Sequence, residues 1–153
     1  MKQLLFCIFL LLLGGCSSNQ PPAVSGQIDE LPAIYPDYTG VTVPQSIAPL
    51  NFAVRTEGKT CAVFTTEGYT FTVYASDGAF SIPNADWNKL LTAAKGKQIE
   101  ISVLTEEKGK WKAFLPFHIR VSEDPVDPYI AYRLIDPGYQ LWNEMGIYQR
   151  ELA

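Results

Sequence analysis

The chain has 153 residues, of which 47% are hydrophobic and 18% are charged, and its formal net charge is −4 at pH 7. This length suits one hydrophobic core rather than two domains. The acidic balance and the lack of a basic cluster along the sequence argue against nucleic-acid binding and against electrostatic adhesion to anionic lipid.

The amino terminus has the pattern of a bacterial export signal. Lys2 precedes an apolar run, Leu4 to Leu13, that is too short to span a bilayer. The next residues, Gly14-Gly15-Cys16, complete a pattern that resembles the lipobox of bacterial lipoproteins, in which the signal is cut before an acylated cysteine. We therefore expect a signal peptide at residues 1–15 and lipidation, as by palmitate, at Cys16. An ordinary secretory signal and an uncleaved anchor are the alternatives.

The residues after the cysteine bear on location. Ser17 in this position favours outer-membrane sorting in the lipoprotein family, and residues 17–20 lack the acidic cluster that resembles a surface-export tag. The resemblance therefore implies a lipid anchor in the outer membrane, on the periplasmic face, with the cell surface as the alternative. Two or three acyl chains hold a protein in the bilayer far more firmly than a single chain does.

A proline-rich stretch follows the signal. Residues 17–50 hold six of the eleven prolines and no lysine or arginine. We expect residues 16–33 to form an extended tether, because prolines do not donate to a regular backbone ladder. The segment from Ile34 to Pro44 is richer in rings and branched side chains, which favours an edge strand lying along the domain.

Short strands are predicted from residue 48 onward. Asn51 to Arg55 and Cys61 to Thr65 are two candidates, and a third lies at Tyr69 to Tyr74, where apolar and polar side chains alternate. Asp77-Gly78 predicts a tight hairpin, with the alternation resuming at Phe80.

One helix is predicted from Asn84 to Gly96. Its apolar residues fall at spacings of three and four, which gives one buried face; these are Trp87, Leu90, Leu91 and Ala94. Asn84 is placed to cap the first turn, and Gly96 to end the helix in the left-handed conformation.

Two further strands follow the helix. Ile99, Ile101 and Val103 return to strand spacing, and Glu106 to Lys110 forms a charged turn. The longest alternation comes next, with one side assigned to the core: Trp111, Ala113, Leu115, Phe117, Ile119 and Val121. Pro116 interrupts this stretch, which indicates either an edge strand or two strands separated by a bulge.

Together these elements predict a mainly β fold with one or two short helices. The expected architecture is an antiparallel β-sandwich of immunoglobulin or fibronectin-III type over residues 34–135. Residues 136–153 are expected to form a terminal helix and a junction segment. Asp136 and Pro137 supply the N-cap and first position of that helix, and Gly146 its end.

Residue types that carry chemistry are few. His118 is predicted to be a solvated strand residue, and Cys61 a small buried one without a disulfide partner. Asp124, Asp127 and Asp136 each precede a proline, where aspartate is typical of turns; a cation site is the alternative. The sequence therefore predicts no catalytic residue, no metal and no cofactor, and not an enzyme.

Large amphipathic rings gather in the carboxy-terminal segment, at Tyr129, Tyr132, Tyr139, Trp142 and Tyr148. Such a composition suits docking onto another protein surface. Planar rings on a β fold also suit stacking against carbohydrate, which is the alternative.

Several stretches resemble the amino-terminal region of TolB-like β-propeller lipoproteins of the Bacteroidetes group. They are Ile34-Tyr-Pro-Asp-Tyr-Thr-Gly-Val-Thr-Val-Pro44, Asp127-Pro-Tyr-Ile-Ala-Tyr-Arg-Leu-Ile-Asp-Pro-Gly-Tyr139 and Trp142-Asn-Glu-Met-Gly-Ile-Tyr-Gln-Arg-Glu-Leu152. In that family the region leads into a Cys-x-x-Cys-His segment that resembles a haem-attachment site, and then into a propeller. This sequence contains neither, so the resemblance implies an abbreviated member and carries over no haem or propeller function.

The leading hypothesis is an outer-membrane-anchored lipoprotein. Its non-enzymatic β-sandwich binds or scaffolds an envelope protein partner through the ring-rich end. A glycan-binding accessory lipoprotein and a truncated fragment of a TolB-like, cytochrome-related propeller protein are the alternatives.

Overall fold

A computed structural model describes residues 20–56, 58–124, 127, 129–134 and 146–151. The predicted signal peptide, Cys16, the predicted helix from Asp136, and the rings of Tyr139 and Trp142 lie outside these residues. No helix within the described part of the chain is long and apolar enough to cross a membrane.

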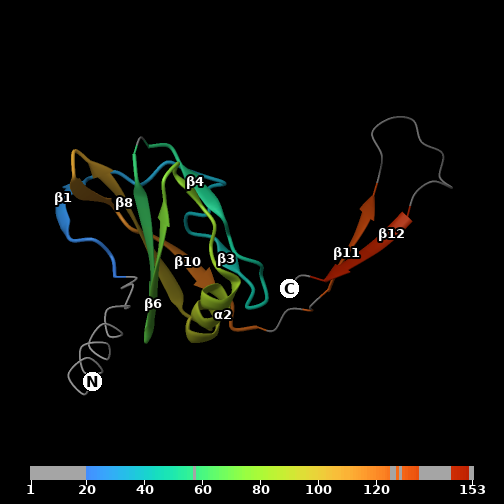
Figure 1. Ribbon diagram of the computed structural model, residues 1–153. Helices are drawn as coiled ribbons and strands as arrows, with labels where there is room; N and C mark the ends of the chain where they lie inside the picture. The colour runs from blue at the N-terminus through green and yellow to red at the C-terminus, as the bar shows by residue number, and fades with distance from the viewer. Residues whose placement is uncertain (1–19, 57, 125–126, 128, 135–145, 152–153) are drawn as a thin grey trace, which may run out of the picture.

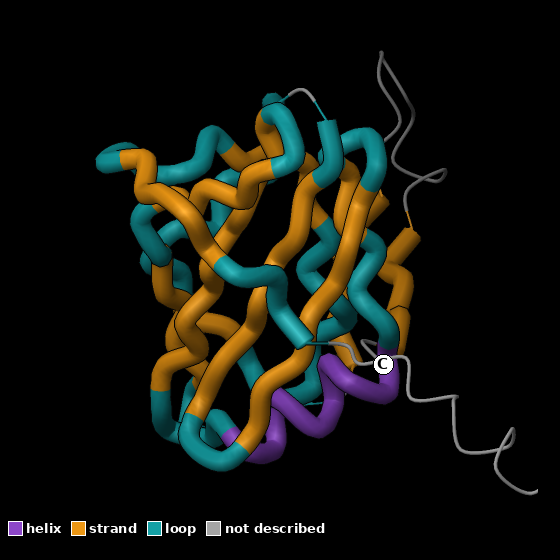
Figure 2. The backbone as a smooth tube through the Cα atoms, turned by 60° about the vertical axis from the view of Figure 1, so that its left-hand side comes forward, coloured by secondary structure: helices purple, strands orange, loops and turns teal. Residues whose placement is uncertain are grey.

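The described chain is mainly β with one helix, as predicted (Figure 1). A large sheet contains β1 (Val24–Ile28), β3 (Thr42–Val43), β5 (Thr60–Thr66), β6 (Tyr69–Ala75), β8 (Gln98–Glu107), β9 (Lys110–Phe114) and β10 (Phe117–Val121). A small sheet contains β2 (Ile34–Tyr35), β4 (Phe52–Val54) and β7 (Ala79–Phe80). The helix is α2 (Asn84–Ala93), and a separate hairpin is formed by β11 (Tyr129–Leu134) and β12 (Gly146–Glu151). Figure 2 shows the helix crossing one end of the stranded body.

Strand β8 is the centre of the large sheet. One edge pairs with β5, and the other pairs with β9 along its second half and with β10 along its first half. The pairing register shifts by one residue between β9 and β10, across Leu115 and Pro116. The predicted break at Pro116 is confirmed as an interruption between two strands on one sheet edge.

The extra residue at this break reverses which side chains face the core. Phe117 is buried and Phe114 packs against the same core, although Phe114 was predicted on the other side. Trp111, which was predicted to face the core, lies instead beside Tyr74, with ring centroids 6.2 Å apart. The side assigned to the core was therefore wrong for the residues before the break, because each inserted residue exchanges the two faces of a strand.

Two strand pairs in the large sheet are parallel. β1 runs parallel to β9, and β3 runs parallel to β10. The sheet is therefore mixed, which corrects the prediction of a wholly antiparallel sandwich. Residues 24–28, which were predicted within the tether at residues 16–33, belong to this sheet. The prediction that the segment from Ile34 to Pro44 lies along the domain is confirmed, because β2 pairs with β4 and β3 with β10.

The core lies between the two sheets and the helix. The Phe52 ring of the small sheet meets the Phe64 and Phe117 rings of the large sheet at 6.5 and 6.2 Å. Trp87 of α2 is fully buried, contacts Phe64 edge-on at 6.4 Å, and donates from Nε1 to the carbonyl oxygen of Ile47 at 3.0 Å. One side chain thus joins the helix, the large sheet and the loop before β4.

The ends of α2 agree with the prediction in one respect. Gly96 has φ of +71° just beyond the helix, which confirms its predicted conformation. The predicted cap at Asn84 was wrong: Pro83 occupies the N-cap position, and no side chain caps the helix. The carbonyl oxygen of Pro83 accepts a hydrogen bond from the backbone N–H of Trp87 at 3.0 Å, so the first turn closes without the Asn84 side chain.

The predicted hairpin at Asp77-Gly78 was wrong, because this turn carries the chain from one sheet to the other. β7 pairs with β4, whereas β6 pairs with β5. Gly78 has φ of +78°, and its carbonyl oxygen accepts a hydrogen bond from the N–H of Val54 at 2.9 Å. The tight turns between paired strands are instead at Glu67-Gly68 and Lys108-Gly109.

Replacing Gly78 by alanine is expected to destabilise the fold more than replacing Gly68. Both glycines have positive φ, so either substitution costs about 1–2 kcal/mol of backbone strain. A Cβ on Gly78 would lie 2.5 Å from the backbone oxygen of Val54, whereas a Cβ on Gly68 would meet nothing within 4 Å. Gly78→Ala should therefore lose a further amount of about 1–3 kcal/mol in urea unfolding. Equal losses in the two variants would contradict the crowded turn.

Candidate functional site

The candidate site is the hairpin of β11 and β12, which projects from the rest of the described chain (Figure 1). β11 was predicted to complete the sandwich that spans residues 34–135. It pairs instead with β12, in a register that joins Tyr129 to Glu151 and Leu134 to Gly146. Residues 146–151 were predicted as a junction after a helix, and the structure places them in a strand. The antiparallel partner, rather than the local sequence, determines this strand.

The register divides the described side chains of the hairpin between two faces. One face carries Ile130, Tyr132, Tyr148 and Arg150, and the other carries Tyr129, Ala131, Arg133, Ile147, Gln149 and Glu151. Tyr132 and Tyr148 are direct cross-strand partners, and their rings stack 5.9 Å apart at an angle of 23°. The rings predicted at Tyr129, Tyr132 and Tyr148 therefore lie on one hairpin, with two of them on a common face.

The hairpin exposes an unusual share of apolar surface. Within the described residues, five of the nine exposed large hydrophobic side chains lie on it, and Ile147 is 86% exposed. Tyr132 and Tyr148 remain 41% and 45% exposed despite their contact. An isolated two-stranded hairpin is marginally stable in water, so a surface that covers these side chains would stabilise it.

A groove separates the base of the hairpin from the body. It has a volume of about 510 Å³ and is lined by Ile47 and Ala48 of the body and by Ile130, Tyr132, Arg150 and Glu151 of the hairpin. Ile47 is the residue whose carbonyl accepts the Trp87 hydrogen bond. The core therefore fixes one wall of the groove, and the hairpin supplies the other.

Local hydrogen bonds form at two of the aspartates before the hairpin, through the carboxylate of Asp127 and through the backbone of Asp124. Asp127 accepts a hydrogen bond at Oδ1 from the backbone N–H of Tyr129 at 2.9 Å, and the N–H of Asp124 donates to Ser122 Oγ at 3.2 Å. Asp136 lies outside the described residues. Among the residues described, no three His, Cys, Asp or Glu side chains form a group that could hold a metal ion.

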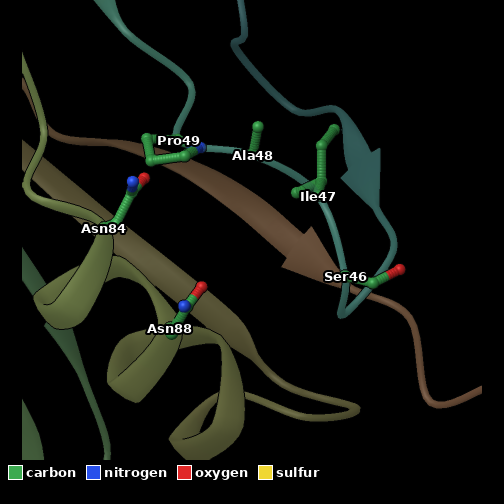
Figure 3. Close-up of a pocket in the computed structure, with 6 residues that line it drawn as sticks. All are labelled: Ser46, Ile47, Ala48, Pro49, Asn84 and Asn88. Carbon is green, nitrogen blue, oxygen red and sulfur yellow. The ribbon is translucent and has the colours of Figure 1, made fainter. Parts of the chain in front are cut away.

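A second pocket, of about 280 Å³, is lined by the loop from Ser46 to Pro49 and by α2. Figure 3 shows that Asn84 and Asn88 of α2 face this loop. The six residues that line the pocket include no ionisable side chain. The pocket offers amide and hydroxyl groups for binding and no acid or base for proton transfer.

His118 has a partner that the sequence did not reveal. It lies opposite Glu100 on the paired strands β10 and β8, and its Nε2 is 3.3 Å from Glu100 Oε2. The two side chains are 45% and 47% exposed. An exposed pair of this kind contributes little to stability. Only the cross-strand register brings the two together, so no local sequence signal could have identified Glu100.

Cys61 is fully buried in β5, as predicted. Burial raises the pKa of its thiol from 9.0 to about 12. The thiolate is the reactive form of cysteine, so the folded chain protects this residue from alkylation and oxidation at neutral pH.

The raised pKa of Cys61 predicts a loss of stability in alkaline solution. The unfolded thiol loses its proton near pH 9, whereas the folded thiol keeps it to about pH 12. The free energy of unfolding should therefore fall across this window by about 1.4 kcal/mol per pH unit. Urea unfolding at several pH values measures this slope, with Cys61→Ala as the control for tyrosine and lysine titration. Parallel slopes in the two proteins would contradict the prediction.

Comparisons with protein families, with curated proteins and with solved structures found no match. The hairpin, the groove at its base and the sequence of the amino terminus are therefore the features that bear on function.

Proposed function

We propose that this chain is a lipid-anchored outer-membrane lipoprotein that binds or scaffolds a protein partner of the cell envelope. Its signal peptide, residues 1–15, is removed and Cys16 is acylated, which holds the chain to the membrane on the periplasmic face or, alternatively, at the cell surface. The body is an immunoglobulin-like two-layer scaffold that presents the hairpin. The projecting hairpin, with its exposed rings, is the observation that carries the proposal.

The composition of the hairpin supports a protein partner. Tyrosine and arginine are enriched in protein interfaces, and apolar side chains at their centre exclude water. Both hairpin faces carry large apolar side chains, with Ile147 on one and the Tyr132–Tyr148 stack on the other. A partner that covers both faces would bury them together.

The pairing of the hairpin supports strand addition as the mode of binding. Within the described residues, β11 and β12 pair only with each other, so each strand has an outer edge of backbone donors and acceptors. A strand of the partner can pair with such an edge, and alternate side chains then determine specificity. The partner would extend the hairpin into a sheet of three or more strands, which is the size at which a sheet becomes stable.

The assignment as a binding module rather than an enzyme rests on the groups available. The groove at the hairpin base contains Arg150 and Glu151 beside apolar residues, and the pocket in Figure 3 contains no ionisable side chain. Neither combines a nucleophile with an adjacent base, which acyl or glycosyl transfer by side chains requires.

Glycan binding is the second candidate. Tyr132 and Tyr148 present stacked, half-exposed rings beside a groove of about 510 Å³, a surface on which sugar rings can stack. Envelope polysaccharide should then quench the fluorescence of Trp142, which lies between β11 and β12 in the sequence. If the hairpin binds only a protein, adding polysaccharide should leave this fluorescence unchanged.

Acylation at Cys16 is tested by metabolic labelling with a radioactive fatty acid. The intact chain should incorporate label and fractionate with the outer membrane, because acyl chains insert into the bilayer. Cys16→Ser should lose the label, and Cys61→Ala, which changes a buried thiol, should retain it. Unchanged labelling of Cys16→Ser would contradict the anchor.

Partner binding is tested by a photo-crosslinking amino acid at Ile147, with Tyr35 as the matched control position. The two side chains are similarly exposed, at 86% and 79%, but Tyr35 lies on the body. In intact envelopes, Ile147 should give a discrete protein adduct that Tyr35 does not give.

Two outcomes would refute the protein-partner assignment. They are the same adducts at both positions, or no protein adduct at Ile147 in cells whose outer membrane contains the anchored chain. In a chain that does form the adduct, exchanging both Tyr132 and Tyr148 for alanine should weaken it, because about 2 kcal/mol or more is typical of a central ring in an interface.

A further inference from the structure

A second aromatic pair lies on the body, away from the hairpin. The rings of Tyr74 and Trp111 meet edge-to-face with centroids 6.2 Å apart, on the face of the large sheet that does not contact the core. Tyr74 is 50% exposed and borders a shallow pocket with Lys59 and Ser76. Neither ring takes part in the partner surface proposed above.

This pair holds the beginning of the described chain. The hydroxyl of Tyr74 donates to the carbonyl oxygen of Gln20 at 2.8 Å, and Ser25 Oγ donates to the carbonyl oxygen of Trp111 at 2.9 Å. Pro22, which lies between Gln20 and Ser25 in the chain, is half-buried. Val24 is the register partner of Trp111 in the parallel pairing of β1 and β9. The amino-terminal segment is therefore fixed to this face from Gln20 onward.

The fixed segment limits how far the body can stand from its anchor. Cys16 precedes Gln20 by four residues. Four residues of fully extended chain span at most about 14 Å. If Cys16 is acylated, as in the proposed function, the Tyr74–Trp111 face must lie within this distance of the bilayer surface.

Lysines surround the same aromatic pair. Lys110 and Lys112 flank Trp111 in the chain, Lys108 lies in the adjoining turn, and Lys59 lines the pocket beside Tyr74. Glu106 and Glu107 neutralise part of this charge, through ion pairs of Lys59 with Glu106 at 3.7 Å and of Lys112 with Glu107. Within the described residues, Lys108 and Lys110 form no ion pair.

The sequence did not reveal this cluster, and the absence of a basic run argued against adhesion to anionic lipid. Pairing of β5 with β8 brings Thr60 beside Thr105, and the carbonyl of Lys59 accepts a hydrogen bond from the N–H of Glu106 at 2.9 Å. Lysines separated by some fifty positions therefore share one end of the body. Lys59 is 73% exposed at this end, and Lys112 is 41% exposed.

We propose that the short, clamped tether holds this lysine-bearing end of the body against anionic phospholipid headgroups of the bilayer that carries its own anchor. The inference rests on acylation of Cys16. Two features favour a lipid surface. The tether is too short to let this end leave the membrane, and its lysines, of which Lys108 and Lys110 form no ion pair within the described residues, are opposite in charge to the headgroups. Trp111 lies where an amphipathic ring can meet the interfacial region.

The test begins with the lipidated full chain and vesicles of phosphatidylcholine, with or without phosphatidylglycerol. Flotation with the vesicles establishes the anchor, and failure to float would refute acylation rather than the orientation. Bound chains are then treated with a water-soluble acetylating reagent, and the modified lysines are measured by mass spectrometry.

Lysines at the two ends of the body provide the comparison. In vesicles that contain phosphatidylglycerol, Lys59, Lys108, Lys110 and Lys112 should react about fivefold more slowly than in a detergent-solubilised control. Lys89 and Lys95, on and just beyond α2, should react equally in both. If the chain floats and both groups of lysines show the same ratio of acetylation rates between vesicles and detergent, the proposal is overturned.

Charge-reversal variants separate headgroup contact from simple proximity. Lys108→Glu combined with Lys110→Glu should remove the protection of Lys59 and Lys112 that depends on phosphatidylglycerol. The matched control, Lys89→Glu combined with Lys95→Glu, makes the same change in charge and should leave that protection intact. Two results would overturn the headgroup contact. One is slow acetylation of these lysines to the same degree in vesicles of phosphatidylcholine alone, and the other is slow acetylation of Lys59 and Lys112 that persists in the variant with Lys108→Glu and Lys110→Glu.

The tether is tested by its length. A ten-residue insertion of glycine and serine between Ser18 and Asn19 adds about 33 Å of reach when fully extended. The inserted chain should still float, but the four lysines should lose most of their protection. Full protection in this variant would contradict a role for the short tether.

Discussion

The buried indole of Trp87 is the interaction on which the rest of the structure depends. Its ring packs edge-on against Phe64 in the large sheet, and its N–H donates to the carbonyl oxygen of Ile47 in the loop before the small sheet. A helix with no side-chain cap is thereby held by tertiary contact rather than by its own ends. The same hydrogen bond sets the position of Ile47, which lines the groove at the base of the hairpin. The core and the candidate binding surface are therefore mechanically joined through one loop.

Local patterns predicted the elements that are stabilised locally. Alternation located β5, β6 and β8, apolar spacing located α2, and Pro116 marked the break between β9 and β10. The parallel pairs of β1 with β9 and β3 with β10 escaped prediction because no turn joins such strands and no short-range signal marks them. Asp77-Gly78 has the residues of a hairpin, but β7 finds its partner in β4. The ring-rich end was visible in the sequence, whereas the strand that pairs Tyr132 with Tyr148 was not.

The strand β8 separates the two proposed surfaces. Its first residue, Gln98, pairs with Arg120 near the end of β10, from which the chain continues towards the hairpin, and its last residue, Glu107, adjoins the lysine-bearing turn. The ten residues of β8 span about 30 Å. Figure 1 shows β1 on the left of the body and the hairpin on the right. A body held at the membrane by its lysine-bearing end would thus present the hairpin away from the bilayer, towards a partner.

This arrangement also determines how the fold would carry force. If the proposed anchor and partner both act on the chain, a moving partner would pull the carboxy-terminal end of β10 one way and the anchor would pull the amino-terminal end of β1 the other way. β1 and β10 both run in the direction opposite to β8, so the load would act along the strands. The hydrogen bonds between strands would then resist together in shear instead of parting one after another. The parallel pairing of β1 with β9 would give the body this resistance to tension.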